Sequence, residues 1–251
     1  MSALHIAWRE LRSLFATATA WLVLLGFSFL AGYFWIWVFS NFVSASTDLV
    51  FDPYASAQLD IGDHLLAPWF GDLAIVVVMV CPALSMRTFS EEVKLKSIEL
   101  LLTSPVSTFQ IVLGKYLGVL GFTAVLLGTA LVGPLSLAWF GEPDNSVVAS
   151  GMLGLFLLAA ANLSLGMFFS SLTENQMVAV VLSVTGGLAL FILGMFDLDN
   201  PDGVLAQLAF TGHLDGLFTG AIKVSDLVYF AAFITFFVFA TWQRVESWRW
   251  R

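Results

Sequence analysis

Charge and cysteine are scarce in this chain. Of its 251 residues only 11% are charged, whereas about a quarter of the residues in a soluble globular domain carry charge. Hydrophobic residues amount to 59%, and a soluble fold of this size could not bury them all. The one cysteine, Cys81, excludes an intrachain disulfide and a cysteine-based metal cluster.

Motifs for nucleotide hydrolysis are also missing. A P-loop needs the spacing Gly-x-x-x-x-Gly-Lys-Ser/Thr, because its backbone amides surround a phosphate. The Gly-Lys pair of this chain, Gly114-Lys115, is followed by Tyr116, and Phe109 stands at the position of the first glycine. The chain is therefore expected to hydrolyse no ATP.

Other catalytic signatures are absent as well. The sequence has neither a His-Glu-x-x-His zinc helix nor a Gly-x-Ser-x-Gly elbow. Its histidines lie in different segments, which disfavours a shared metal site: His5, His64 and His213. We therefore expect a protein that is not an enzyme and that holds no metal or cofactor of its own.

Long apolar runs are what the chain has in abundance. A helix needs roughly 20 apolar residues to cross a hydrocarbon core of about 30 Å. Because lipid offers no partner for unpaired backbone groups, such runs are expected to be helical. The sequence thus predicts an all-α, polytopic membrane protein, with one transmembrane domain over 1–251. The six predicted spans are about 16–40, 67–86, 107–135, 147–170, 177–196 and 226–243.

The basic residues predict the orientation, since lysine and arginine beside a span stay in the cytoplasm. If the six spans alternate, one side receives Arg9, Arg12, Arg87, Lys94, Lys96, Lys115, Arg244, Arg249 and Arg251. The other side has Lys223 and most of the acidic residues. We therefore expect a multi-pass protein of the bacterial cytoplasmic (inner) membrane with both termini in the cytoplasm. The net charge of −8 lies mostly on the outer face and gives no reason to expect nucleic acid.

Residues 1–15 predict a short helix on the inner membrane surface. Apolar side chains recur there at helical spacing: Leu4, Trp8, Leu11 and Phe15. The opposite face is polar and has Arg9, Glu10, Arg12 and Ser13. A helix of this kind lies in the interface, with tryptophan at headgroup depth. The alternative is that the segment simply extends the first span.

The segment 87–105 is the most highly charged part of the predicted cytoplasmic side. Ser90 is a candidate N-cap, and Glu91 and Glu92 follow where carboxylates complement the helix dipole. A polar face and an apolar face come next: Glu92, Lys96, Glu99 and Thr103 against Leu95, Ile98 and Leu102. Ser104-Pro105 is expected to begin the following helix. This amphipathic helix is either a docking element for a soluble partner or an ordinary solvated loop helix.

Small and hydroxyl side chains inside two spans also have two interpretations. They are Asn162, Ser164, Ser170 and Ser171 in the fourth, and Ser183, Thr185, Gly186 and Gly187 in the fifth. Close helix packing is favoured over a substrate path. Glu174, in the turn between these spans, is either a second contact with a soluble partner or a solvated acid.

Three stretches resemble the permeases of ABC-2 type transporters. The middle one is Arg87-x-Phe89-x-Glu91-Glu92, then Ser97-Ile98-Glu99-Leu100-Leu101-Leu102-Thr103-x-Pro105-Val106-Ser107 and Ile111-Val112-Leu113-Gly114-Lys115-Tyr116. The others are Ala7-Trp8-Arg9-Glu10-Leu11-Arg12-x-x-Phe15 and Phe218-x-Gly220-x-Ile222-x-x-x-Asp226-Leu227-x-Tyr229-Phe230. Within the family, the chain is most similar to the gliding-motility-associated GldF type. It departs from its relatives at Lys96-Ser97, where they usually carry Gly-Thr.

The resemblance implies the ABC-2 exporter fold. That fold has an elbow helix at 1–15, a cytoplasmic coupling helix at 87–105 that sits in a groove of an ATP-binding subunit, and a re-entrant helical pair within 197–225. The docking residues that it implies are Arg87, Phe89, Glu91, Glu92, Lys94, Lys96, Glu99, Leu100, Leu101, Leu102 and Pro105, with Glu174 as a candidate second contact.

The resemblance also implies partners. These are two copies of the ATP-binding subunit, which would hold ATP and Mg²⁺, a second permease copy or a related permease, membrane lipid, and a periplasmic GldG-like subunit. The chain is then the permease of an ATP-driven ABC transporter, working either in export or in force transmission to the periplasmic partner. The apolar interior suits lipid-like or polymeric cargo.

The alternative function is a secondary transporter or channel that is not coupled to ATP. Such proteins place ionisable groups or broken helices at mid-bilayer, and the centres of the six predicted spans have no carboxylate or base.

Overall fold

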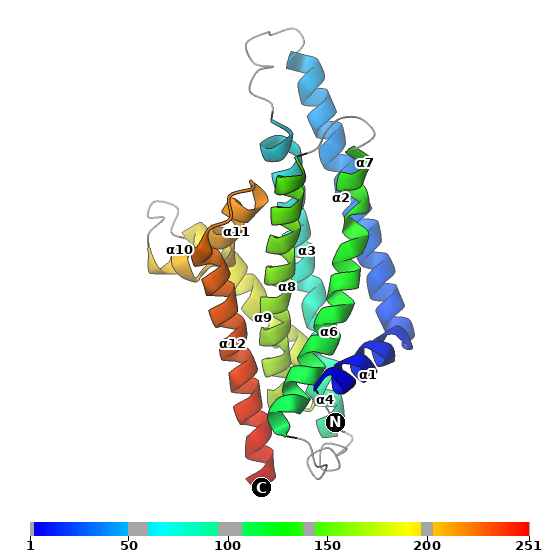
Figure 1. Cartoon of the computed structure of the whole chain (residues 1–251), viewed down its shortest axis with the longest axis vertical. Coiled ribbons are helices and arrows are strands. Elements are labelled where there is room, and N and C mark those ends of the chain that lie inside the picture. Colours follow the sequence, from blue (N-terminus) through cyan, green and yellow to red (C-terminus); the bar gives the residue numbers. More distant parts are fainter. Residues whose placement is uncertain (1–2, 50–59, 95–106, 138–143, 197–202, 251) are drawn as a thin grey trace.

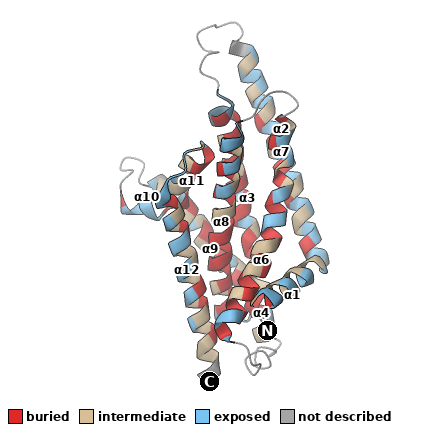
Figure 2. Cartoon of the chain, in the orientation of Figure 1, coloured by how far each residue is buried: buried red, intermediate tan, exposed pale blue. Residues whose placement is uncertain are grey.

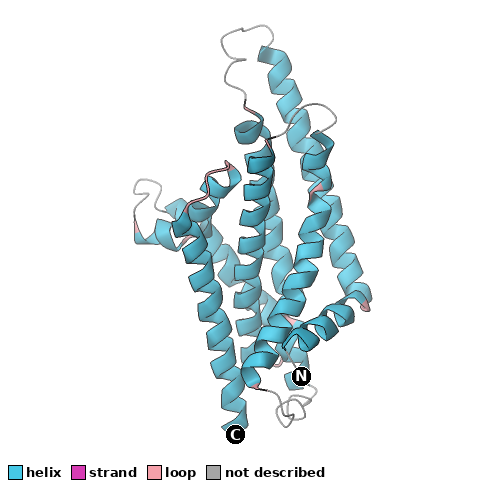
Figure 3. Cartoon of the chain, in the orientation of Figure 1, coloured by secondary structure: helices cyan, strands magenta, loops and turns pink. Residues whose placement is uncertain are grey.

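The computed structural model describes residues 3–49, 60–94, 107–137, 144–196 and 203–250, and every regular element in those ranges is a helix (Figures 1 and 3). Long helices run between the two ends of the bundle. One end has both termini and is called the termini end below (Figure 1). Toward the opposite end, called the hairpin end below, two short helices lie beside the bundle: α10 (Val204–Leu208) and α11 (Phe210–Phe218) (Figure 1). The long helices are α2 (Ala18–Leu49), α3 (Ala67–Ser85), α6 (Thr108–Ala130), α8 (Asn145–Leu172), α9 (Gln176–Ile192) and α12 (Val224–Glu246).

Shorter helices complete the described chain. At the termini end are α1 (Ala3–Phe15), α4 (Arg87–Lys94) and the 3₁₀ turn η4 (Ser247–Trp250). Toward the hairpin end are the π-helical turn η2 (Gly62–Leu66), α7 (Val132–Leu137), the 3₁₀ turn η3 (Leu193–Phe196), α10 (Val204–Leu208) and α11 (Phe210–Phe218). Residues 95–105 of the predicted coupling helix and residues 197–202 of the predicted outer region lie outside the described residues.

Within the described residues, five helical stretches are long and apolar enough to cross a membrane: Ala18–Thr47, Gly62–Lys94, Thr108–Leu137, Asn145–Leu172 and Val224–Glu246. The chain is therefore a multi-pass membrane protein. The fifth predicted span falls on α9, which has 17 residues and continues into η3. Because α9 alone is shorter than the usual span, the count of six stays a prediction.

Two helix boundaries differ from the apolar runs that predicted them. The α2 helix continues to Leu49, beyond the expected end near residue 40, because backbone hydrogen bonding continues after the apolar run stops. The predicted third span, 107–135, is interrupted at Leu131, where α6 ends and α7 begins. Pro134 explains the break, since it has no N–H to donate to the carbonyl four residues earlier.

Burial divides the bundle into a centre and a periphery. In Figure 2, α3 and α8 are largely buried, whereas α2 and α12 show long exposed stretches. Many of the exposed side chains on α2 are large and apolar, including Leu22, Leu25, Phe29 and Ile36. Lipid tails are as apolar as these side chains, so a membrane covers them without cost.

Glycines bring the central helices close together. A Cβ at Gly151 of α8 would overlap the ring of Phe70 on α3, and one at Gly187 of α9 would overlap the amide oxygen of Asn162. Apart from Ser170, the buried serines of α8 and α9 donate within their own helices: Ser164 donates to the Ala161 carbonyl at 2.7 Å, for example. These contacts favour helix packing over a substrate path for the small and polar residues of α8 and α9.

The N-terminal segment is a separate helix, so the alternative that it extends the first span is wrong. The α1 helix ends at Phe15, and the chain turns before α2 starts at Ala18 (Figure 1). It lies against α6, where a Cβ at Gly114 would be 2.7 Å from that of Ile6, and one at Gly118 would be 2.6 Å from that of Glu10. Leu4 and Trp8, from the predicted apolar face, are exposed. Leu11 and Phe15 of the same face contact α6 instead, at Gly121 and at the Phe122 ring, whose centroid is 5.0 Å from that of Phe15. Only the first half of the predicted apolar face is therefore left open to the membrane.

Replacing Gly118 by alanine should separate α1 from α6. The added methyl group would meet Glu10 and the Ala7 carbonyl, and overpacking of this kind costs about 1–3 kcal/mol of unfolding free energy. We expect the melting temperature of the detergent-purified protein to fall by several degrees.

Gly128→Ala is the matched control, because nothing lies within 4 Å of a Cβ at Gly128 on the same helix. There, alanine should be neutral or slightly stabilising, because it favours a helix more than glycine does. Equal shifts in the two variants would mean that α1 is not held through Gly118.

Candidate functional site

The short helix α4 is bound to the bundle through a serine of α8. Ser170 Oγ donates to the Met86 carbonyl at 2.8 Å and accepts from the backbone N–H groups of Phe89 and Ser90 at 3.2 and 3.1 Å. The first N–H groups of a helix have no partner within it, so this hydroxyl supplies one. It also fixes the junction of α3 and α4 against α8.

The prediction that Ser90 is an N-cap is wrong. The helix already begins at Arg87, and Ser90 lies inside it, with its hydroxyl donating to the Met86 carbonyl. A local cap is unnecessary because Ser170 of another helix binds the first turn. The N-cap of α6 is Ser107, whose side chain accepts from Gln110 N at 3.3 Å. The expected start of this helix at Ser104-Pro105 falls outside the described residues.

A buried lysine ties α4 to two further helices. Lys115 of α6, with a side chain only 3% exposed, has its Nζ 2.7 Å from Glu92 Oε1 of α4 and 3.8 Å from Glu10 Oε2 of α1. The same Nζ lies 5.5 Å from the centre of the Phe89 ring. A buried ammonium group is costly unless it is paired, so α1 and α4 supply what Lys115 needs.

Aromatic contacts extend this cluster toward the C-terminus. The Phe89 side chain is fully buried, and its ring meets that of Trp248 edge-on, with centroids 6.5 Å apart. The Arg244 guanidinium lies 5.9 Å from the Trp248 ring centre, within the range of a cation–π contact. Arg87, at the start of α4, donates to Thr19 Oγ1 of α2 at 3.0 Å. The inner face of α4 thus contacts elements from the whole length of the chain.

The other face of α4 is open. Glu91 and Lys94 are exposed, and Lys94 lines a hollow of about 380 Å³. The remaining lining residues come from the turn between α8 and α9 and the start of α9: Glu174, Asn175, Gln176 and Met177. Asn175 fixes this turn as the N-cap of α9, since its side chain accepts from Met177 N at 3.0 Å. The structure therefore brings together Lys94 and Glu174, for which the sequence predicts two separate contacts.

The predicted docking residues fall into three groups. Glu91, Lys94 and Glu174 are exposed at the termini end. Arg87, Phe89 and Glu92 face other helices of the bundle. Lys96, Glu99, Leu100, Leu101, Leu102 and Pro105 lie outside the described residues. Docking by these residues stays a prediction, and the internal contacts of Glu92 and Phe89 add a structural role.

Sequence reasoning missed Glu10, Lys115 and Ser170 as parts of this cluster. One signal was present, because Lys115 lies inside the apolar run 107–135, and a charge within a span requires a partner. The spacing could not say which carboxylate serves, since Glu10, Glu91 and Glu92 all lie on the same predicted side.

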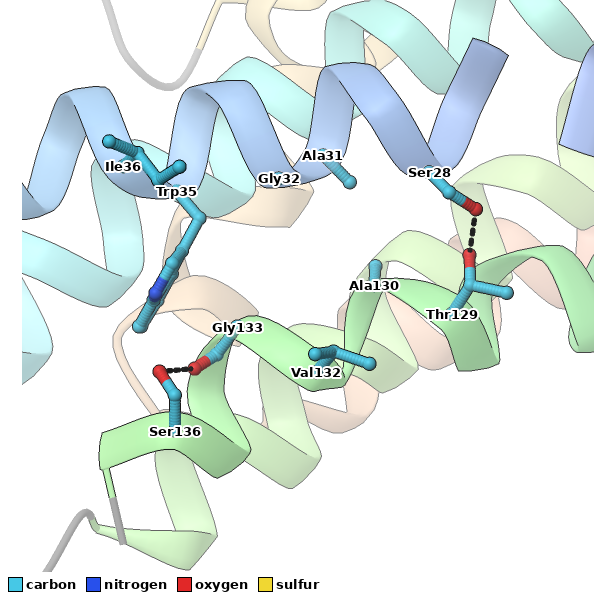
Figure 4. Close-up of a pocket in the computed structure, with 10 residues that line it drawn as sticks. All are labelled: Ser28, Ala31, Gly32, Trp35, Ile36, Thr129, Ala130, Val132, Gly133 and Ser136. Carbon is cyan, nitrogen blue, oxygen red and sulfur yellow. Dashed lines mark hydrogen bonds between the residues drawn. The ribbon is translucent and has the colours of Figure 1, made fainter. Parts of the chain in front are cut away.

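Another hollow, of about 410 Å³, lies between α2 and the α6–α7 pair (Figure 4). Trp35 forms one wall and touches Gly133, where a Cβ would be 2.8 Å from the indole ring. Its polar side chains are already satisfied: Ser28 Oγ donates to Thr129 Oγ1 at 2.9 Å, and Ser136 Oγ donates to the Gly133 carbonyl at 2.6 Å. We interpret this hollow as a lipid-covered seam between helices.

Glu92 should matter to stability far more than its neighbour Glu91. Glu92→Gln removes the closest counter-charge of a buried lysine, which costs about 1.5–3 kcal/mol for a charged hydrogen bond. Glu91→Gln changes an exposed side chain and should stay within about 0.5 kcal/mol. Thermal unfolding in detergent measures both.

Lys115→Met gives a second test of the same pair. Combined with Glu92→Gln, it should cost less than the sum of the two single changes, because neither charge is then left without its partner. Additive losses would show that the two side chains act independently.

Comparison with known families gives one match. The model of a family described as ABC-2 family transporter protein matches residues 69–211, which is more than half of the chain and includes most of α3 and all of α4, α6, α8 and α9. No curated protein matches the chain.

Proposed function

This chain belongs to the ABC-2 transporter family, and we propose that it is the permease subunit of a transporter driven by a separate ATP-binding subunit. The observation that carries the proposal is the position of α4. It follows directly on α3, contacts helices on its inner side, and exposes Glu91 and Lys94 beside the Glu174 turn. A partner that binds there could move the bundle by pushing on this one short helix.

Force applied to α4 would reach three spans. One turn residue, Met86, separates it from α3. Lys115 couples it to α6, and Ser170 couples it to α8. Because close-packed helices move as rigid bodies rather than deform, displacement of α4 would tilt or shift these spans together.

The ATP-binding subunit would be held at α4 by many weak contacts. Exposed ion pairs contribute about 0–1 kcal/mol each, so no single charge is expected to carry docking. The hollow beside α4 offers both signs of charge, from Lys94 and Glu174. It also offers an apolar side chain, Met177, which is 69% exposed. This mixture suits a groove with complementary charges and an apolar floor.

The need for a separate ATPase is consistent with the environment of Gly114-Lys115. In a P-loop, the glycine amide and the lysine face a phosphate. Here Gly114 lies against Ile6 and the Ala3 carbonyl, while Lys115 faces two carboxylates that would repel a phosphate. We therefore propose that ATP and Mg²⁺ bind only to the partner, with two ATP-binding subunits serving two permeases, either two copies of this chain or one copy and a related one.

The cargo and the finer class rest on the sequence resemblance. Similarity to GldF-type permeases favours a complex that also contains a periplasmic GldG-like subunit, with the hairpin end as the place of contact. In that version the motion of α4 is passed across the membrane as force. In the export version it opens a path for lipid-like or polymeric cargo.

Charge reversal on the exposed face of α4 should uncouple the ATPase. The triple variant Glu91→Lys, Lys94→Glu and Glu174→Lys removes three contacts, which together are expected to lower permease-stimulated ATPase turnover by about tenfold or more. Turnover is measured on the complex that co-purifies in mild detergent, together with the amount of ATP-binding subunit retained.

Lys223→Glu, at the hairpin end, is the matched control and should leave turnover unchanged. Full stimulation of ATPase turnover by the triple variant would exclude α4 as the docking site. Transport by the purified chain alone would instead favour the alternative, a secondary transporter or channel that is independent of ATP.

We also propose that the termini end faces the cytoplasm, with the chain in the bacterial inner membrane. Arg9, Arg12, Arg87, Lys94 and Arg244 gather at that end, and the positive-inside tendency places such charges in the cytoplasm. Fused after the C-terminus, a green fluorescent protein should fluoresce, whereas an alkaline phosphatase should be inactive. The reverse pattern would place α4 outside the cell and exclude docking of a cytoplasmic ATPase.

A further inference from the structure

A third hollow, of about 400 Å³, lies at the hairpin end between α3, α9 and α11. Its walls are mostly apolar and include Ile75 of α3, Phe191 of α9, and Leu214 and Phe218 of α11. Pockets of this volume with apolar walls and few polar groups are typical of small-molecule and lipid sites. Unlike the hollow in Figure 4, this one has a charged residue in its lining, Asp215.

Asp215 lacks a partner among the described residues. No hydrogen bond or ion pair of its side chain occurs there, and partial burial raises the pKa of its carboxyl above the ordinary value. Asp226, nearby at the start of α12, is the opposite case. It is 5% exposed, lies 2.9 Å from His213 Nδ1, and accepts from Ser225 Oγ at 3.3 Å. The fold thus provides hydrogen-bond partners for Asp226, whereas it leaves Asp215 at the edge of an apolar hollow.

Asp215 remains exposed to solvent at the edge of the hollow, so a cation can pair with it while an apolar body attached to that cation covers the apolar walls. Thr211 and Thr219 also line the hollow and add hydroxyl acceptors for an N–H donor. The hollow lies beside the start of α3 and the end of α9, and the ends of membrane-spanning helices lie where lipid headgroups meet acyl chains. Phospholipid with an amine headgroup has both parts at this depth.

We propose that the hollow between α3, α9 and α11 binds a phospholipid with an ethanolamine headgroup. The ammonium group pairs with Asp215, and part of an acyl chain lies against Ile75, Phe191 and Leu214. The site requires only that the chain is embedded in a membrane, so it is independent of the proposed coupling to an ATPase.

Gly71 provides a way to fill the hollow. It lines the site from α3, and nothing lies within 4 Å of a Cβ built on it. In Gly71→Leu the side chain would therefore enter the space of the acyl chain without displacing protein atoms. Gly26→Leu is the matched control, because Gly26 of α2 has equally open surroundings and lies outside this hollow.

The test is native mass spectrometry of the purified chain, delipidated in detergent and titrated with equal amounts of palmitoyl-oleoyl phosphatidylethanolamine, phosphatidylcholine or phosphatidylglycerol. The intact chain should retain phosphatidylethanolamine about fivefold more tightly than phosphatidylglycerol, the factor expected of one partly exposed charge pair. Phosphatidylcholine, whose cation has no N–H donor, should bind less tightly than phosphatidylethanolamine.

Asp215→Asn should abolish the headgroup preference while some lipid remains bound, and Gly71→Leu should lower retention of phosphatidylethanolamine. Asp63→Asn, on the exposed turn η2 outside the hollow, and Gly26→Leu should behave as the unchanged chain. Melting temperatures establish that each variant is folded, and Ile75→Trp serves as a second filling variant if Gly71→Leu is unstable.

Three results would overturn the proposal. They are equal retention of the three lipids, an unchanged headgroup preference in Asp215→Asn, or full retention when the hollow is filled. Each is measured without an ATP-binding subunit, so failure of this site leaves the proposed transporter function standing.

Discussion

The termini end of this protein depends on one buried ammonium group. Lys115 lies inside an apolar helix bundle, where its charge is tolerated only if carboxylates come to it. The two that do so belong to the shorter helices α1 and α4. A single electrostatic requirement thus holds the N-terminal helix and the proposed docking helix against the same span, and the tight contacts at Gly114 and Gly118 leave α1 little freedom to move away.

Adjacent residues of α4 therefore face different surroundings. Phe89, Ser90 and Glu92 contact α6, α8 and η4, while Glu91 and Lys94 face outward. A helix with one bonded face and one open face can pass a push inward, which a solvated loop could not do. The hairpin end has a similar division, since Asp226 is held by His213 and Ser225 whereas Asp215 borders an apolar hollow. The structure thus distinguishes charges that support the fold from charges that are available to partners.

The sequence predicted the long helices because a helix that crosses a hydrocarbon core needs a long apolar run, and such runs can be found in the sequence directly. It failed where a neighbour in space supplies a missing partner. Ser90 has the chemistry of an N-cap, but Ser170 from α8 binds the first turn, so α4 starts earlier. The periodicity of its own segment places Glu92 on a polar face, and it cannot reveal a lysine on another helix. Pro134 in α7 could have predicted the break at Leu131, because its missing N–H is a local property.

The sequence by itself determined that this is a helical membrane protein without a nucleotide-binding loop, because these properties follow from composition, run length and short motifs. It also indicated which segments face water, since charge cannot remain in lipid unpaired. Only the tertiary structure decided which charges pair with one another, that Lys94 and Glu174 border one hollow, and that Asp215 borders another. Those outcomes depend on distances between helices far apart in the chain, and such distances are set by close packing at glycines and serines, which no single segment encodes.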